Sequence, residues 1–301
     1  MDRIEQYRVF VHVAELGSFI QAARVLKLPR ATVSAAVQQL ETSVGTRLLH
    51  RTTRKVTLTT DGAQLLERAR QVLADIEDID QLFQNHQQQV TGRLDVDVPS
   101  RIARRLIIPA LPELLRQYPG LQLSLGSTDR AIDLVQEGVD CVIRFGEPHS
   151  SSLVVKPLGK VILVNCAAPA YLAECGRPEH PDDLENGHLC VGYVSGAGGQ
   201  ELPWECVVDG IEQSRQLPSQ VIVNNAESYI ASCRAGLGLI QVPLFDVQHL
   251  LDAGVLVEVM AAYRAPPMTV SVLYPDRRQR SRRLGVFIEW FTALIKPCLA
   301  D

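Results

Sequence analysis

The sequence contains no hydrophobic run of the roughly 18 residues that a membrane-spanning helix needs. It also lacks the apolar core of a signal peptide, because its first twenty residues include the charged side chains Asp2, Arg3, Glu5, Arg8 and Glu15. We therefore expect a soluble cytoplasmic protein without a membrane partner. A chain of 301 residues is long enough for about two domains.

Cysteine is present but never in a CxxC pair. The seven cysteines are scattered and odd in number, which argues against a disulfide framework and a zinc knuckle (Cys141, Cys166, Cys175, Cys190, Cys206, Cys233, Cys298). We interpret them mostly as small buried hydrophobic residues. A redox-sensing pair such as Cys190 with Cys206 stays open, although no basic residue stands beside either thiol to lower its pKa.

The motifs of common enzymes are absent as well. None of the seven histidines lies in an HExxH motif, and neither a GxSxG nor a phosphate-loop motif occurs. The glycines of 196–199 lack the strand-to-helix context of a dinucleotide fingerprint. We therefore expect a protein that is not an enzyme, with no catalytic residues, no metal site and no cofactor.

Positive charge is concentrated at the start of the chain. Residues 1–60 contain nine Lys and Arg residues against four acidic ones, a net charge of +5, so residues 61–301 carry −9 within the total of −4. A basic head joined to an acidic body is typical of a protein that binds a polyanion such as DNA. Chance clustering of solvated charges stays open as an explanation for the head alone.

Three short helices are predicted in the head. The first ends at Gly17, Ser18 caps a second over Phe19–Leu26, and a third runs over about 30–44 and stops at Gly45. The abrupt turn before the third helix matches a helix-turn-helix motif over about 19–38. The expected inward side chains are Ile4, Tyr7, Phe10, Val11 and Ala14, then Ala22, Ala23 and Leu26, then Val33, Val37 and Leu40.

A hairpin and a long helix are predicted next. The runs 47–51 and 55–59 read as a hairpin with cationic residues at its tip, the wing. Thr60 is the expected cap of a helix over about 61–89, whose apolar side chains recur every three or four residues (Leu65, Leu66, Ala69, Val72, Leu73, Ile76, Ile79, Leu82, Phe83). A second copy of this helix is the favoured cover for the stripe, and packing on its own domain is the alternative.

Strands and helices alternate from about residue 93 onward. Strands are expected at 94–98, 121–125, 141–144, 161–166, 189–193, 221–223, 239–242 and 270–274, and helices at 100–117, 128–136, 227–234 and 283–295. This order predicts an α/β body with a parallel sheet and helices on its faces.

The N-terminal segment resembles the LysR-type transcriptional regulators. The resemblance is carried by the run FVHVAELGSFIQAARVLKLPRATVSAAVQQLETSVGTRLLHRTTRKVTLTTDG, the long helix and the α/β body. It implies a winged helix-turn-helix domain (1–59), a linker or dimerisation helix (60–91) and a two-lobed effector-binding domain like a type 2 periplasmic binding protein (92–301). Lobe I would comprise 92–160 and 267–301, and lobe II 161–266.

The resemblance also implies partners. It implies double-stranded DNA at interrupted palindromic promoter sites, a small-molecule effector, RNA polymerase, and assembly into a dimer through the linker helix and then a homotetramer. Helix N-termini favour an anionic effector, whose binding would shift the lobes and re-space the DNA-binding heads. A constitutive architectural protein that ignores small molecules is the competing function. A secreted solute-binding protein would leave the basic head unexplained.

The recognition helix departs from the pattern of many family members. They carry Ser-Gln-Pro-Ala at the turn into this helix and Ser-Arg-Gln inside it, whereas this chain has Leu28-Pro29-Arg30-Ala31 and Ser34-Ala35-Ala36. The operator sequence therefore does not transfer by analogy.

DNA contacts are expected at the start of the recognition helix and on the wing. The candidates are Arg30, Ala31, Thr32, Ser34 and Ala35 on the helix, and Arg51, Arg54 and Lys55 on the wing. Arg30 either pairs with guanine O6 and N7 or contacts phosphate alone, and both interpretations stay open. Arg51 has a structural alternative.

Effector contacts are expected at the carboxyl ends of the strands, where open α/β sheets bind ligands. Ser100 and Thr128 match positions at which family members hold effectors. The other candidates are Arg101, Asp129, Arg144, Phe145, Trp204 and Asn225. Structural alternatives are a helix cap for Ser100, a paired neighbour for Asp129, surface salt bridges for Arg101 and Arg144, and the core for Trp204.

We predict different losses from two alanine substitutions in the head. Arg54→Ala should weaken binding to all DNA sequences, because a cation at the wing tip contacts the backbone or a narrow minor groove. Arg30→Ala should also relax sequence preference, because a guanidinium that reads guanine is lost. Affinities for target and random DNA measured at one salt concentration test this. Equal losses on both DNAs for Arg30→Ala would remove its assignment as a base reader.

Overall fold

The computed structural model describes residues 1–51, 56–81, 90–129, 134, 137–146, 153–194, 200–275 and 281–300. The chain divides into two compact units, Met1–Gly92 with Gln136–Gly138, and Arg93–Val135 with Val139–Asp301. In this described part, no helix is both long and apolar enough to cross a membrane.

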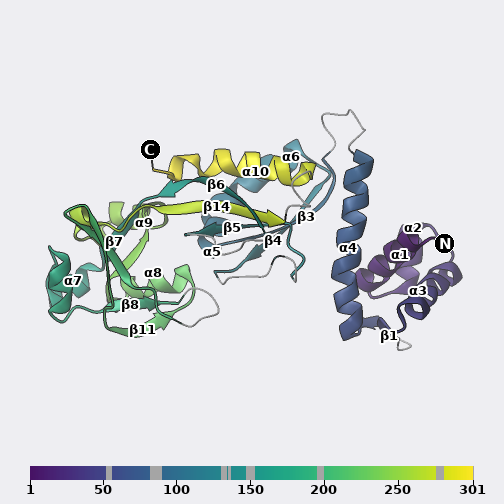
Figure 1. Ribbon diagram of the computed structural model, residues 1–301, viewed down its shortest axis with the longest axis horizontal. Coiled ribbons are helices and arrows are strands. Elements are labelled where there is room, and N and C mark those ends of the chain that lie inside the picture. Colours follow the sequence, from purple (N-terminus) through teal and green to yellow (C-terminus); the bar gives the residue numbers. More distant parts are fainter. Residues whose placement is uncertain are drawn as a thin grey trace. The chain divides into compact units, whose positions relative to one another are not determined.

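The first unit is a winged helix-turn-helix followed by a long helix (Figure 1). Its elements are α1 (Arg3–Leu16), α2 (Phe19–Leu26), α3 (Arg30–Val44), β1 (Leu49–Arg51), β2 (Val56–Leu58) and α4 (Thr60–Gln81). The predicted bounds of α2 and α3 are confirmed. Ser18 Oγ accepts a hydrogen bond from Gln21 N (3.3 Å), and Gly17 and Gly45 end their helices with φ of 58° and 76°.

The core of this unit differs from the prediction in α1. Phe10, together with Val33, Val37 and Leu40 of α3, is buried as expected, but Ile4 is exposed. Val9 and Val13, which the predicted stripe omitted, are fully buried. The reason is that α1 packs against both α3 and α4, so it buries more than one stripe.

The predicted wing is confirmed as an antiparallel hairpin of β1 and β2, paired from Leu49 with Leu58 to Arg51 with Val56. The tip residues 52–55 lie outside the described residues. The predicted cap of the long helix was wrong by one residue, because Thr59 Oγ1, not Thr60, accepts from Gly62 N (2.9 Å). The same hydroxyl donates to the Arg47 carbonyl (2.8 Å), which joins the cap to the segment between α3 and β1.

A carboxylate ties the recognition helix to the wing. Glu41 Oε1 accepts hydrogen bonds from the backbone N–H groups of Leu48 (3.0 Å) and Leu49 (3.2 Å). Leu48 lies just before β1 and Leu49 is its first residue, so the carboxylate provides an acceptor for two backbone donors at the start of the strand. The contact links α3 to the start of the wing through two backbone amides.

The head itself covers much of the described stripe of α4. Leu66 and Ala69 are buried in the head's core, and Leu65 and Leu73 pack against it. An ion pair between Arg70 Nη2 and Glu15 Oε1 (2.8 Å) joins α4 to α1. Val72 is 42% exposed. The alternative interpretation, packing on its own domain, therefore holds for this part, and the predicted positions 82–89 lie outside the described residues.

The second unit contains a five-stranded sheet in the order β4-β3-β5-β14-β6. The strands are β3 (Gly92–Val98), β4 (Leu121–Ser127), β5 (Cys141–Phe145), β6 (Leu153–Val161) and β14 (Met268–Pro275). β3 and β5 are parallel as predicted, but β14 is antiparallel to β5 and to β6, so the sheet is mixed where a parallel sheet was predicted. The chain leaves this sheet through β6 and re-enters it through β14, in the opposite direction.

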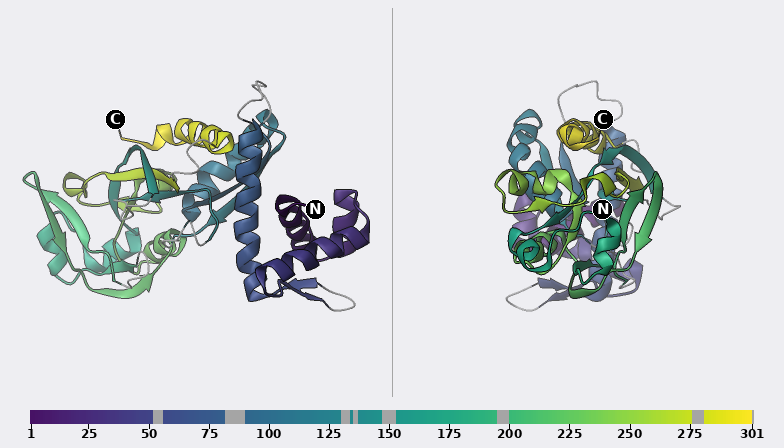
Figure 2. Two further views of the ribbon diagram at one scale, coloured as in Figure 1. Left: turned by 45° about the vertical axis from the view of Figure 1, so that its right-hand side comes forward. Right: turned by 90° about the vertical axis from the view of Figure 1, so that its left-hand side faces the viewer.

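Two long helical segments accompany this sheet. Figures 1 and 2 show α10 (Arg282–Ile295) lying along the sheet, and it buries Leu284, Phe287 and Phe291. The predicted helix over 100–117 is continuous but not uniform. It consists of α5 (Ser100–Ile102), a π-helical segment (Ala103–Ile107) and α6 (Ile108–Gln117). The π-helical segment shifts the register of the side chains that follow it.

A second group of strands has a hydrophobic core of its own, drawn from residues between Val164 and Met260. β7 (Leu163–Ala167) pairs with β12 (Ile240–Pro243) and β13 (Val257–Glu258), β8 (Cys190–Tyr193) with β11 (Ser219–Val223), and β9 (Trp204–Val208) with β10 (Ile211–Arg215). The helices are α7 (Pro169–Cys175), α8 (Ala226–Arg234) and α9 (Leu244–Asp252). Short 3₁₀ turns occupy Pro181–Glu185, Ala261–Tyr263 and Lys296–Cys298.

Several of these elements were not predicted, namely β6, β9, β10, β13, α7 and α9. One local signal was present. Asp209-Gly210 lies between β9 and β10, with φ of 51° and 78°, as expected for the dipeptide that closes a tight hairpin. The predicted helix over 128–136 falls largely on residues outside the described part of the chain.

The close approach of α4 to the wing makes Gly62 a sensitive position. A Cβ atom there would lie 1.9 Å from the carbonyl oxygen of Leu48. We predict that Gly62→Ala lowers the unfolding free energy of the head by about 2 kcal/mol or more, because backbone must move.

Gly285→Ala in α10 is the matched control, since its Cβ meets nothing within 4 Å. This substitution should be neutral or stabilise by up to about 1 kcal/mol, through helix propensity alone. Unfolding in urea, monitored by the hydrogen exchange of amides in each unit, measures both effects. A Gly62→Ala head as stable as the wild type would contradict the packing argument.

Candidate DNA-binding surface and effector site

The start of α3 presents the predicted DNA contacts. Arg30, Ala31 and Ala35 are exposed, while Thr32 and Ser34 are half-buried. The helix is held from behind by Val33, Ala36, Val37 and Leu40 in the core. A rigid helix with exposed residues at its N-terminal end has the form needed to enter a major groove. The side chain of Arg51 and the residues Arg54 and Lys55 lie outside what the structure describes.

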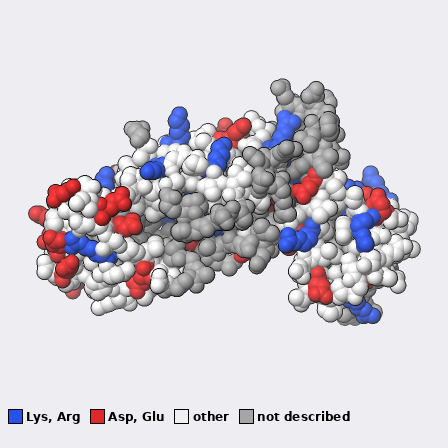
Figure 3. All heavy atoms as spheres, viewed as in Figure 1, with Lys and Arg blue, Asp and Glu red and all other residues white. Residues whose placement is uncertain are grey.

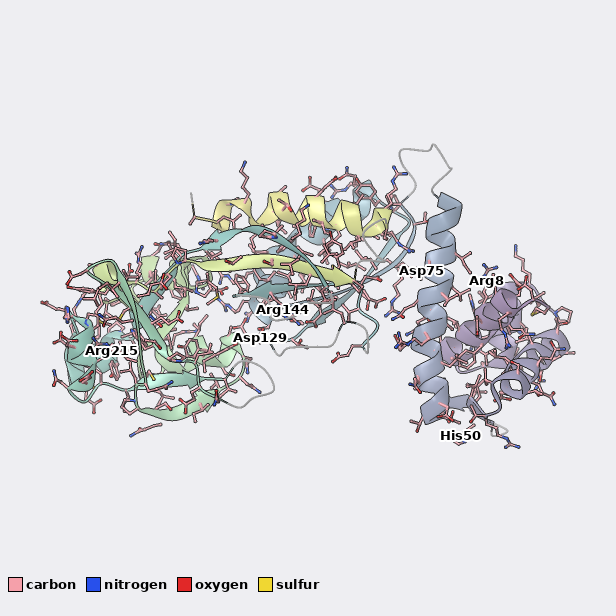
Figure 4. All side chains as sticks on the ribbon, in the orientation of Figure 1. Arg8, His50, Asp75, Asp129, Arg144 and Arg215 are labelled. Carbon is pink, nitrogen blue, oxygen red and sulfur yellow. The ribbon has the colours of Figure 1, made fainter. Side chains whose placement is uncertain are left out.

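The buried carboxylate of Asp97 collects two predicted effector contacts at the ends of the strands. Thr128 Oγ1 donates to Asp97 Oδ1 (2.9 Å), and Arg144 Nη2, on the side chain labelled in Figure 4, donates to the same oxygen (2.6 Å). Asp97 was not predicted, although an acid within the apolar strand β3 is a recognisable signal. Arg144 is therefore in a salt bridge, as the alternative held, but with a buried partner and not on the surface.

The Asp129 carboxylate lies at the start of two helices. Its Oδ1 accepts from Ser100 N (2.7 Å), and its Oδ2 accepts from Ser100 Oγ (2.9 Å) and from Ala226 N (2.7 Å). Asp129 thus pairs with neighbours, which was one of its two interpretations. The Ser100 hydroxyl donates to this carboxylate instead of capping its own helix. Asn225 caps α8 through Ser228 N (2.8 Å) and lies next to Ala226.

Arg101 is buried and joins the two groups of strands. Its Nη1 donates to Glu227 Oε2 on α8 (2.9 Å). Its Nε and Nη2 donate to Oδ1 (3.2 Å) and the backbone carbonyl (2.5 Å) of Asp246 on α9. Burial raises the pKa of Asp246 to about 6, although nearby Arg101 opposes the rise. Neither acid was predicted, because both lie more than a hundred residues from Arg101 in the sequence.

Two aromatic pairs include predicted or neighbouring residues of this region. Phe145 stacks on Phe245 with ring centroids 6.2 Å apart, and Tyr193 meets Tyr229 edge to face at 5.0 Å. Burial raises the pKa of Tyr193, and the charges of Asp129 and Asp246 raise it further. Trp204 is buried in the core of the second strand group, as its structural alternative held. Its Nε1 has no acceptor among the described residues.

The predicted effector residues thus fall into separate sets. Ser100, Asp129 and the start of α8 meet at one point, and Thr128 and Arg144 meet at Asp97. Arg101 belongs to the acidic pair on α8 and α9. The contacts of Asp129 and of Arg101 join the two strand groups, whereas those of Thr128 and Arg144 with Asp97 lie at the five-stranded sheet.

The comparisons with known proteins decide the family. The model of the LysR substrate binding domain matches residues 87–295, and that of the bacterial regulatory helix-turn-helix protein, lysR family, matches residues 4–63. The chain belongs to the LysR family of transcriptional regulators. The predicted fold class and the predicted function are thereby confirmed: a helix-turn-helix DNA-binding domain is followed by an effector-binding domain of mixed helix and sheet.

Relatives of full length support the same assignment. The chain is 41% identical to the uncharacterized HTH-type transcriptional regulator YhjC of Escherichia coli over 99% of this chain and 100% of that protein. It is 33% identical to the HTH-type transcriptional repressor PA14_22550 of Pseudomonas aeruginosa, over 98% of this chain and 92% of that protein. The solved structure of CrgA, a LysR-type regulator from Neisseria meningitidis, is 28% identical with a TM-score of 0.61, over 96% and 97%. These names indicate a regulator, not an enzyme.

Other features of this LysR-type regulator lie apart from the predicted site. A pocket of about 420 Å³ is lined by residues of α9, β13 and their surroundings, including Leu244, Leu251, Asp252, Glu258 and Arg264, and contains none of the predicted contacts. Among the described residues, no group of three or more His, Cys, Asp or Glu side chains could hold a metal ion. Acidic side chains gather over the α7 end of the second unit in Figure 3.

The thiols give no support to the redox pair. Cys190 and Cys206 are both free. Burial, with the charge of Glu201, raises the pKa of Cys190 to about 11, and burial also raises that of Cys206. A redox sensor needs the opposite shift, toward the thiolate.

The raised pKa of Asp246 predicts a pH effect on stability. This carboxyl binds its proton more tightly in the folded protein, at a pKa of about 6, than in the unfolded chain, at about 3.9. Its contribution to stability therefore falls as the pH rises from about 4 to about 6.

We predict that the unfolding free energy of the wild type, relative to that of Asp246→Asn, drops over this range by on the order of 1 to 3 kcal/mol. Denaturant unfolding of both proteins at several pH values measures the difference. Parallel stability curves for the two proteins would show that this carboxyl keeps its ordinary pKa on folding.

Proposed function

We propose that this chain is a sequence-specific regulator that reads double-stranded DNA with residues 1–59, through a helix-turn-helix at about 19–38. The base and phosphate contacts would come from Arg30, Ala31, Thr32, Ser34 and Ala35, with Arg51, Arg54 and Lys55 on the wing. The exposure of Arg30, Ala31 and Ala35 on a helix anchored by a buried face supports this assignment. The net charge of +5 over residues 1–60 supplies the attraction to phosphate.

We infer that the regulator assembles through its linker helix, residues 60–91, into a dimer and then a tetramer. The exposed Val72 leaves part of the apolar stripe of α4 for a second copy. A dimer would match an interrupted palindrome, with half-sites about one helical turn apart. It would act in the cytoplasm, at promoters where RNA polymerase binds.

We propose further that residues 92–301 sense a small anionic metabolite between two lobes, 92–160 with 267–301, and 161–266. The observation that carries this proposal is the set of contacts at Ser100, where a carboxylate is held by a hydroxyl and by the first amides of two helices. These helices follow different strand groups, so a ligand there can favour one arrangement of the lobes. The change in population would re-space the DNA-binding heads.

Titration of the full-length protein with a panel of small carboxylates tests this function. Thermal stability reports binding, and nuclease protection of promoter DNA reports the spacing of the heads. At least one compound is expected to raise the melting temperature and to change the protected pattern at the same concentrations.

Ser100→Ala should lose both responses and still bind DNA, because it removes only a hydroxyl in the effector domain. Ser232→Ala, on α8 away from its start, is the matched control and should respond like the wild type. A protein whose DNA protection never changes with any compound that binds it would be a constitutive architectural protein instead.

A further inference from the structure

The Asp129 carboxylate is bound as a ligand would be. Both of its oxygens are used, and the three donors are the amide and hydroxyl of Ser100 and the amide of Ala226, at 2.7 to 2.9 Å. Hydrogen bonds from helix-terminal amides to a carboxylate are charge-assisted and stronger than neutral ones. The carboxylate comes from a third segment, which follows β4.

The three donors come from both strand groups of the effector domain. Ser100 directly follows β3 of the five-stranded sheet, whereas Ala226 begins α8, which packs on β8 and β11 of the second group. A single side chain therefore bridges the two groups at the point where the effector is proposed to bind. Any other carboxylate that uses these donors has to take the place of Asp129.

Two cations in the described part of the effector domain, Arg101 and Arg144, are already matched. Arg101 contacts Asp246 and Glu227, and Arg144 contacts Asp97. A second anion placed next to Asp129 would meet like charge, and the guanidiniums of Arg101 and Arg144 are engaged with other carboxylates. Two carboxylates side by side in a partly buried site repel each other strongly. Occupation by Asp129 and occupation by an external anion are therefore mutually exclusive.

We propose that Asp129 is an internal ligand, which fills the anion position of the effector site and holds the two strand groups together until an anionic effector displaces it. This proposal rests on the proposed function, because it concerns the same site. A tethered carboxylate has a high effective concentration at its donors, so it lowers the apparent affinity of any external competitor. Release of Asp129 would be the event that separates the unliganded arrangement from the liganded one.

Chemical rescue by formate tests the proposal in the full-length protein. Asp129→Ala removes the carboxylate and leaves space of the size of formate beside the three donors. The variant should melt at a lower temperature than the wild type in sodium chloride. Replacement of chloride by formate, on the order of 100 mM at constant ionic strength, should raise its melting temperature by roughly 2 to 4 °C in a saturable way.

Three proteins serve as controls for this rescue. The wild type should show no specific response to formate, because Asp129 occupies the donors. Asp129→Asn should show none either, because its amide group fills the same space. Asp182→Ala removes a carboxylate that is 69% exposed and paired with Arg215, so it reports any general effect of formate on a variant that has lost an acid.

A saturable response confined to Asp129→Ala supports the internal ligand. An equal response in the wild type or in Asp182→Ala overturns it, as does the absence of any response in Asp129→Ala. If Asp129→Ala does not fold in chloride, circular dichroism should show that formate restores the fold, and a chain that stays unfolded in formate also overturns the proposal.

The rescue needs neither DNA nor the natural effector, so it fails independently of the proposed function. If metabolites still change the DNA protection of the wild type but formate does not rescue Asp129→Ala, only the internal ligand is wrong. If rescue succeeds and no metabolite changes DNA protection, the sensing function is wrong and the bridge is purely structural.

Discussion

The buried guanidinium of Arg101, beside one strand group of the effector domain, needs partners from the other group, and this requirement holds the groups together. A cation removed from water costs several kcal/mol unless opposite charge and hydrogen bonds offset the loss of hydration. Asp246 provides a carboxylate and a backbone carbonyl, and Glu227 provides a second carboxylate. Arg101 stands beside the five-stranded sheet, while both acids stand on helices of the other strand group. Within the fold, the charge of Arg101 therefore has its partners only when the two groups are together.

Polar contacts between two separately packed groups suit a regulator. The second group has its own hydrophobic core, and the chain passes between the groups where β6 ends at Val161 and where β14 begins at Met268. A continuous apolar interface would hold one arrangement firmly, because apolar surface resists exposure. Hydrogen bonds such as those of Asp129 can be exchanged for contacts with water or with a ligand at lower net cost. This difference makes an equilibrium between arrangements accessible to a small molecule.

The head could be predicted more fully than the body because its helix ends depend on local contacts. Gly17, Ser18 and Gly45 act within one turn of the helices they bound, so α2 and α3 begin and end where the sequence predicted. The error at Thr59 and Thr60 has the same origin, because adjacent threonines present the same local signal. In the body, the antiparallel course of β14 depends on where the chain re-enters the sheet, and no neighbouring residue encodes that direction.

The family, the DNA-binding head and the order of the two domains follow from the sequence itself, since they rest on motifs of closely spaced residues whose side chains act on their own backbone. The roles of the charged residues in the body were decided only by the tertiary structure. Arg144 contacts Asp97, which lies 47 residues away in the sequence, and Asp129 contacts Ala226, which lies 97 residues away. The sequence presents each of these groups as an equal candidate for ligand or salt bridge. Which of the two it becomes depends on which charge the fold brings within hydrogen-bonding distance, because a buried charge is stable only beside its partner.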